Sequence, residues 1–172
     1  AQWGNNTELG GPSEIEGTGV FPQDMLTDCA MSWQVENRFA NGVVLVHMDD
    51  ATSKKHPLQV GGHGHGVAFL GTEGWVHVDR GNLSSSPDSL VELKPGANDV
   101  SLFQSANHHA NFVGAAKGRR PPASPIDAAV RVDTLCHLQQ IAIKLRRKLR
   151  WDPAQETFMN DAEANAMLDR PM

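Results

Sequence analysis

The sequence of 172 residues contains no tyrosine and only two cysteines, Cys29 and Cys136. Two cysteines so far apart exclude a disulfide-rich scaffold and a cysteine zinc site. No stretch approaches the roughly 18 to 20 consecutive apolar residues that a membrane-spanning helix needs. Basic side chains are fewer than acidic ones, 15 against 20, which gives a net charge of −5. That balance argues against a protein that binds nucleic acid through phosphate contacts.

Common catalytic signatures are also missing. No G-x-G-x-x-G follows a strand pattern, and there is no Walker loop and no nucleophile elbow. No pair of carboxylates stands out as a general acid and base, so we expect no catalytic residue in this chain. The length predicts a single domain over 1–172. The chain begins Ala1-Gln2-Trp3, with neither Met nor a signal peptide, which predicts a chain that is processed or cut from a longer one.

The first half of the chain, about 13–93, has strand patterns. Alternation over 13–21 predicts a strand with Ile15 and Val20 inward, and alternation over 29–39 predicts a second strand. Asn41-Gly42 predicts a type I′ turn into a return strand over 43–48. A loop over 51–66, a second hairpin over 67–78, a loop over 81–89 and a short strand over 89–93 follow.

The second half, about 100–169, changes to helical spacing. Apolar residues recur by threes and fours over about 100–117, and Ser124-Pro125 predicts the start of a long helix with Ser124 as its N-cap. A short helix at about 160–169 closes the chain. Strands followed by helices predict an α+β fold, with a mainly antiparallel open sheet and helices on one face.

The expected strand over 43–48 carries apolar side chains on both faces. Val44, Val46 and Met48 alternate with Val43, Leu45 and His47, so the face that the helices leave open is expected to be apolar. An open apolar face predicts a partner, most simply a second copy of the chain. Val44, Val46 and Met48 are therefore our interface candidates.

A loop rich in glycine and histidine follows, with His63-Gly64-His65 at its centre. An H-x-H pair can hold zinc, and His47, His56 and His77 could add a ligand. The acidic residue that such sites usually place shortly after the pair is missing, so we predict no metal site. The alternatives that stay open are a mobile loop with solvated imidazoles and a loop that contacts a small polar ligand.

Short motifs, through their order and spacing, carry a resemblance over essentially the whole chain. They are Ala1-Gln2-Trp3-Gly4, Pro12-Ser13-Glu14-Ile15-Glu16-Gly17, Asn41-Gly42, Gly71-Thr72-Glu73-Gly74-Trp75-Val76, Asn111-Phe112, Ser124-Pro125, Cys136-His137-Leu138, Leu149-Arg150-Trp151-Asp152-Pro153, Glu163-Ala164-Asn165-Ala166 and Arg170-Pro171-Met172. In these motifs the chain resembles the C-terminal domain of the Gfo/Idh/MocA family, named after glucose–fructose oxidoreductase, inositol dehydrogenase and a rhizopine-catabolism protein.

The resemblance implies a two-domain parent. Its N-terminal Rossmann domain would bind NAD or NADP and would carry the catalytic lysine and the acid/base residues, none of which matches a position here. This chain would then supply walls of the substrate pocket, through Lys54, Lys55, His63 and His65, and the surface for self-association. We expect it to bind no cofactor and to be inactive alone.

Two other functions remain as alternatives. The chain could be a stand-alone carbohydrate-binding or assembly module, or, less favoured, an enzyme with a histidine-bound metal. We expect a cytoplasmic location, or a periplasmic or exported one if a missing N-terminal segment held a signal. The expected partners are a sugar-like small molecule, the Rossmann domain and further copies of the chain, with neither nucleic acid nor membrane.

Overall fold

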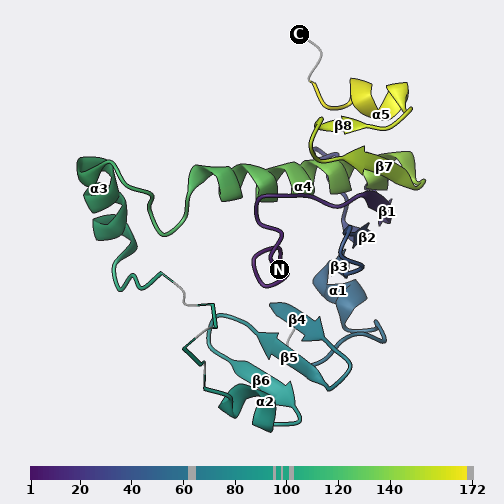
Figure 1. Ribbon diagram of the computed structural model, residues 1–172. Coiled ribbons are helices and arrows are strands. Elements are labelled where there is room, and N and C mark those ends of the chain that lie inside the picture. The colour runs from purple at the N-terminus through teal and green to yellow at the C-terminus, as the bar shows by residue number, and fades with distance from the viewer. Residues whose placement is uncertain (62–64, 95, 98, 101–102, 170–172) are drawn as a thin grey trace.

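The computed structural model describes residues 1–61, 65–94, 96–97, 99–100 and 103–169. His63 therefore lies outside the described residues. The chain forms a five-stranded sheet and a three-stranded sheet, and every strand pair in both sheets is antiparallel (Figure 1). The predicted α+β class with an open antiparallel sheet is confirmed. None of the described helices has the length and hydropathy that crossing a bilayer requires.

The larger sheet has the strand order β3-β2-β1-β7-β8. Its strands are β1 (Glu14–Val20), β2 (Ser32–Arg38), β3 (Val44–Met48), β7 (Leu149–Asp152) and β8 (Thr157–Phe158). β1 and β2 pair over their whole length, from Glu14 opposite Arg38 to Val20 opposite Ser32. Only helices were expected beyond residue 100. Strand β7, which pairs with β1, and strand β8 are a correction to that expectation.

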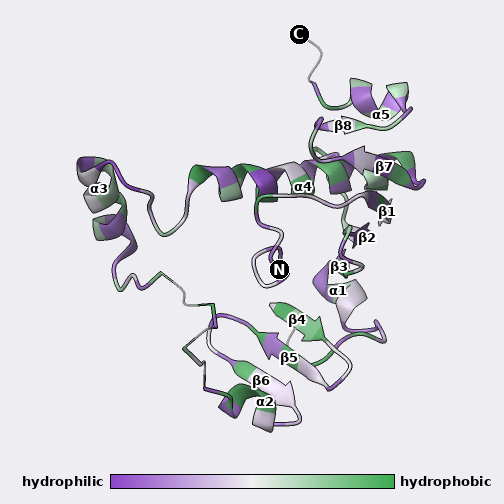
Figure 2. Cartoon of the chain, in the orientation of Figure 1, coloured by the Kyte–Doolittle hydropathy of each residue, from purple (hydrophilic) through white to green (hydrophobic). Residues whose placement is uncertain are grey.

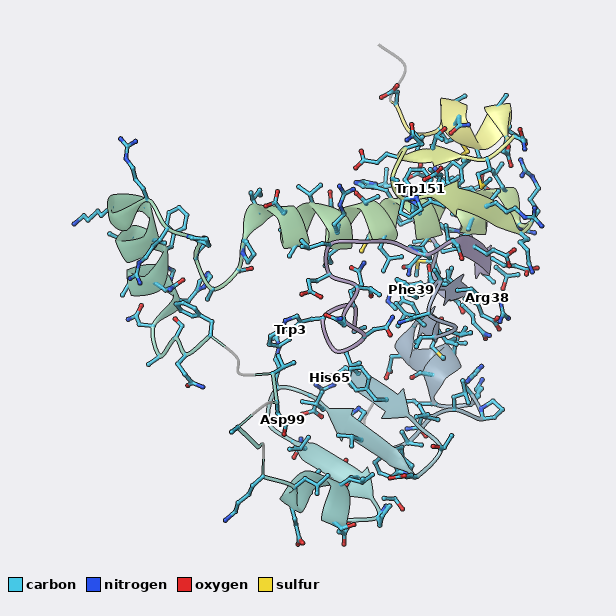
Figure 3. The ribbon with its side chains drawn as sticks, viewed as in Figure 1. Trp3, Arg38, Phe39, His65, Asp99 and Trp151 are labelled. Carbon is cyan, nitrogen blue, oxygen red and sulfur yellow. The ribbon has the colours of Figure 1, made fainter. Side chains whose placement is uncertain are left out.

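The hydrophobic core lies between this sheet and the second half of helix α4 (Ile126–Leu145). Ile15 of β1 and Val35 of β2 are fully buried against the helix, together with Leu138. In the same core cluster, the ring of Trp151, which is labelled in Figure 3, meets the Phe158 ring edge-on at a centroid distance of 5.0 Å. Burial of these large side chains is the main stabilising contribution in this part of the molecule.

The first half of α4 has little cover. Figure 1 shows it extending beyond the sheet towards α3 (His108–Gly118), and the hydropathy colouring of Figure 2 alternates along it. Ile126 and Val130 are exposed there. The start of this helix also differs from the prediction. Pro125 is the N-cap residue and no side chain caps the helix, so Ser124 is not its N-cap.

The outer face of the five-stranded sheet is polar over β1 and β2, which corrects the expectation of an apolar face. The residues that point away from α4 on these two strands are mostly charged or amide-bearing: Glu14, Glu16, Thr18, Gln34, Glu36 and Arg38. Val20 is also on this side and is 63% exposed, not inward as predicted. Apolar side chains on this face are otherwise those of β3 at the sheet edge: Val44, Val46 and Met48.

The turn that leads into β3 also differs from the prediction. Gly42 has a φ of 87°, whereas Asn41 does not have a positive φ. The Phe39 carbonyl accepts from the Gly42 amide, and the Phe39 amide donates to the Val43 carbonyl. This is the pattern of a three-residue connection with a bulge at glycine, not of a type I′ turn.

The smaller sheet comprises β4 (Val67–Leu70), β5 (Trp75–Val78) and β6 (Leu83–Ser86), in that order. The hairpin of β4 and β5 has the bounds that the sequence predicted. β6 was predicted to be loop, and residues 89–93 were predicted to be a strand where the structure has helix α2 (Ser89–Glu92). A second short helix, α1 (Asp50–Ser53), overlaps the start of the predicted loop over 51–66.

The remaining helices begin later than predicted. α3 begins after Asn107, whose side chain accepts from the Ala110 amide, and this cap sets the start at His108 rather than near residue 100. α5 (Ala162–Ala166) lies within the predicted range and is capped by Asp161.

Candidate functional site

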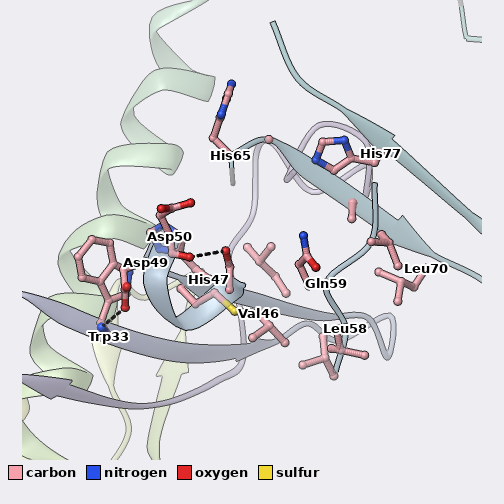
Figure 4. Close-up of a pocket in the computed structure, with 17 residues that line it drawn as sticks. Trp33, Val46, His47, Asp49, Asp50, Leu58, Gln59, His65, Leu70 and His77 are labelled. Carbon is pink, nitrogen blue, oxygen red and sulfur yellow. Dashed lines mark hydrogen bonds between the residues drawn. The ribbon is translucent and has the colours of Figure 1, made fainter. Parts of the chain in front are cut away.

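A cleft of about 510 Å³ lies between the edge of the larger sheet and the smaller sheet (Figure 4). β3 and α1 form one wall, and residues 58–60 together with β4 and β5 form the other. The residues that line it are Trp33, Val44, Leu45, Val46, His47, Met48, Asp49, Asp50, Ser53, Leu58, Gln59, Val60, His65, Gly66, Ala68, Leu70 and His77. Apolar walls with a few polar groups are typical of a site for a small molecule.

Asp49 has a structural role at this cleft. Its Oδ2 accepts hydrogen bonds from the Thr52 hydroxyl at 2.6 Å, the Trp33 amide at 2.8 Å and the Ser32 hydroxyl at 2.9 Å. Its Oδ1 accepts from the Ala51 and Thr52 amides and so caps α1. The Thr52 hydroxyl, followed by the backbone amides and the Ser32 hydroxyl, holds the pKa of this carboxyl well below its ordinary value, against the opposing effect of burial. The carboxylate joins α1 to β2 and is already fully bonded.

The two lysines predicted to line a pocket lie outside the cleft. The Lys54 ammonium is 2.7 Å from Oδ2 of Asp50, one turn earlier, and both side chains are more than half exposed. Lys55 is exposed. Neither belongs to the cleft lining, whereas Asp50 does. The local helix α1 explains this arrangement, because residues four apart on a helix lie side by side and draw Lys54 to Asp50.

Gly61 and Gly66, on either side of the undescribed residues 62–64, pack against a buried histidine. His77 of β5 is 4% exposed, and its ring lies where a side chain at either Gly61 or Gly66 would collide with it. Both glycines have positive φ, 79° and 123°, which other residues rarely adopt. Gly61 and Gly66 therefore let the backbone approach the imidazole of His77 closely.

The other histidines of the predicted set fall in different places. His65 is exposed and lines the cleft, as does His47, whereas His56 does not. Among the residues that the structure describes, no three His, Cys, Asp or Glu side chains gather in a way that could hold a metal ion. His63, the other member of the H-x-H pair, lies outside the described residues.

Sequence reasoning missed the contribution of β3 to this site. It considered His47 only as a possible metal ligand, and it assigned Val44, Val46 and Met48 to an interface between copies, whereas all four residues line the cleft. The sequence signal for the contribution of β3 to the cleft is its position next to a loop rich in polar residues. The position of β3 at the sheet edge, which opens it to the cleft, depends on pairing that only the fold reveals.

The described residues do not fit a dinucleotide cofactor. Rossmann-type sites need parallel strands joined by a helix, with the pyrophosphate at the helix N-terminus. All the strand pairs that the structure describes are antiparallel. We therefore assign no residue of this chain to a nicotinamide cofactor.

The chain was compared with known proteins. A search of curated proteins finds no match. The model of the oxidoreductase family's C-terminal alpha/beta domain, in the Gfo/Idh/MocA group, matches residues 20–172. This match spans both sheets except the part of β1 before Val20, together with the cleft and the five helices that the structure describes. The chain thus belongs to the Gfo/Idh/MocA oxidoreductase family, of which it is a C-terminal domain.

Proposed function

We propose that this chain is the substrate-pocket and oligomerisation domain of an NAD(P)-dependent oxidoreductase that acts on a sugar or polyol. The observation that carries the proposal is the cleft beside β3, in a domain of an oxidoreductase family. The cofactor and the groups that transfer protons would belong to an N-terminal domain. The residues described above would bind and orient the substrate and exclude water from it.

The chemistry of the cleft favours a polyhydroxylated ligand. Sugars present C–H faces that pack on apolar or aromatic surface, and hydroxyl groups that need hydrogen-bonding partners. Trp33, Val46 and Leu70 supply the first kind of surface, while Gln59 and His65 supply the second. This combination supports a sugar-like molecule better than a purely apolar ligand.

The charges of the cleft favour a neutral ligand. Its described lining includes two carboxylates, Asp49 and Asp50, and neither a lysine nor an arginine. Phosphate and carboxylate groups are usually recognised by arginine, lysine or helix N-termini. We therefore propose a neutral sugar or polyol, not a sugar phosphate or a sugar acid.

Titration of the ¹⁵N-labelled chain with glucose or myo-inositol tests the proposal by NMR. We expect shifts of the Trp33 indole and Gln59 amide signals, and weaker effects from glucose 6-phosphate and gluconate. Gln59→Leu should weaken binding, and Lys55→Met, outside the cleft, should leave it unchanged. The absence of any saturable shift with the neutral ligands would contradict the proposed function.

Self-association is a separate part of the proposal. Val44 is exposed on the outer face of β3, where a second copy could cover the sheet beside the cleft. Sedimentation of the wild-type chain and of Val44→Glu measures this, with a dimer or larger species expected for the first and a shift to monomer for the second. A wild-type monomer at all concentrations would remove oligomerisation from the proposed role.

A further inference from the structure

His47 and Gln139 form a hydrogen bond between the sheet edge and the core helix. His47 lies on β3 at the cleft, and Gln139 lies on the buried side of α4, where it is 5% exposed. Nδ1 of His47 is 2.8 Å from Oε1 of Gln139. The His47 ring also meets the Trp33 ring edge-on, with a centroid distance of 6.0 Å and an interplanar angle of 64°. The imidazole is thereby held in one orientation.

The partner atom decides which tautomer His47 adopts. An amide oxygen can only accept a hydrogen bond, so Nδ1 must carry the hydrogen. In a neutral imidazole the other nitrogen, Nε2, is then an acceptor. If the Gln139 side-chain amide were flipped by about 180°, its nitrogen would donate to Nδ1 and the ring would be in the Nε2–H tautomer.

A glutamine at this position needs a specific reason. Burial of an amide among Leu138, Ala142 and the rest of the core costs free energy unless the amide is hydrogen-bonded. An apolar side chain would fill the space without that cost. The amide contacts an exposed ring instead of the backbone, which indicates that its role concerns His47.

We propose that Gln139 holds His47 in the Nδ1–H tautomer, so that Nε2 accepts a hydrogen bond from a hydroxyl group of the ligand in the cleft. Gln139 is a positioning residue here and has no contact with the ligand. The two carboxylates of the cleft lining are already engaged, since Asp49 is bonded to α1 and β2, and Asp50 pairs with Lys54. The ligand in this inference rests on the proposed function, whereas the tautomer of His47 does not depend on it.

Side-chain ¹⁵N NMR of the histidine-labelled chain tests the tautomer without any ligand, with His47→Asn to assign the signal. In the neutral ring we expect the hydrogen on Nδ1 in the wild type. Gln139→Met should shift the population towards Nε2–H, whereas Gln139→Glu, which keeps an acceptor, should retain Nδ1–H. Gln140→Met is the matched control, because it makes the same change one position along α4. An Nε2–H ring in the wild type would overturn the proposal.

Binding of glucose and myo-inositol tests the second half. Loss of one oriented hydrogen bond should weaken binding by roughly tenfold in Gln139→Met. Gln139→Glu should restore most of the loss, and Gln140→Met should have no effect. Binding that is unchanged in Gln139→Met would refute the contact with the ligand. If neither ligand binds even the wild type, the proposed function fails, and the tautomer measurement still decides the role of Gln139.

Discussion

The two sheets of this domain are stabilised in different ways. The larger sheet has a continuous apolar core against α4, with Ile15, Val35 and Leu138 almost fully buried. In the strands of the smaller sheet, the buried side chains are polar, His77 and Ser85, while Phe69 and Leu70 are exposed. A sheet that buries so little apolar surface depends on its neighbours for stability. The cleft lies where the two meet, so one wall is firmly supported and the other is not.

The largest effect is expected from a cavity in the core of the larger sheet. Leu138 is 1% exposed, and Leu138→Ala should lower the free energy of unfolding by roughly 2–5 kcal/mol. Val78→Ala in the smaller sheet, where the side chain is 40% exposed, should cost well under half of that. Urea denaturation of both variants measures the contrast. Equal losses would show that the smaller sheet has a core of its own.

A smaller effect is expected at the junction beside the cleft. In Asp49→Asn an NH₂ group would replace the oxygen that accepts from the Trp33 amide. Because the Trp33 amide can only donate, this hydrogen bond would be lost. We expect a loss of roughly 1–3 kcal/mol in the free energy of unfolding. Asp50→Asn, with its exposed ion pair, serves as the control and should change stability little. A larger effect from Asp50 than from Asp49 would contradict the structural role given to Asp49.

The smallest effect is expected from the charged cluster at the end of the larger sheet. Arg147 bonds to both oxygens of Asp161 and to Glu163 at 2.8 Å. Its guanidinium, and then the Ala164 amide, lowers the pKa of Asp161 from 3.8 to about 2. The contribution of this depressed pKa to stability is complete above about pH 4 and is lost as the pH falls towards 2.

Arg147→Met should therefore raise the pKa of Asp161, which an NMR titration of its carboxyl group measures. The difference in urea midpoint between the variant and the wild type should shrink as the pH falls from 4 towards 2. Arg146→Met is the control, because the Arg146 side chain reaches the Gly19 carbonyl, not a carboxylate. A difference in midpoint that does not depend on pH would argue against the ion pair as its cause.

The sequence predicts those elements whose signals are local. The β4–β5 hairpin is predicted to the residue, because two apolar runs flank a short glycine-bounded turn. β6 is missed since three of its four residues are serines, which read as loop. β7 and β8 are missed because they are very short and β7 pairs with β1, which is distant in the sequence.

The site could be predicted only in part for the same reason. The local histidine pattern points to His65, which does line the cleft. Lys54 was expected there but pairs with Asp50 through helix α1, which has too few residues to give a periodic pattern. The bond between His47 and Gln139 joins residues that only the packing of α4 on the sheet brings together.

The first residues of the chain pack against a strand that forms part of the cleft wall. Gly4 lies against the Phe69 ring so closely that any side chain at this position would collide with it. Phe69 points to one side of β4, while its neighbours Ala68 and Leu70 line the cleft on the other. A side chain at position 4 would displace the Phe69 ring on the back of this wall, so glycine is what lets the N-terminal turn pack against the strand that lines the cleft.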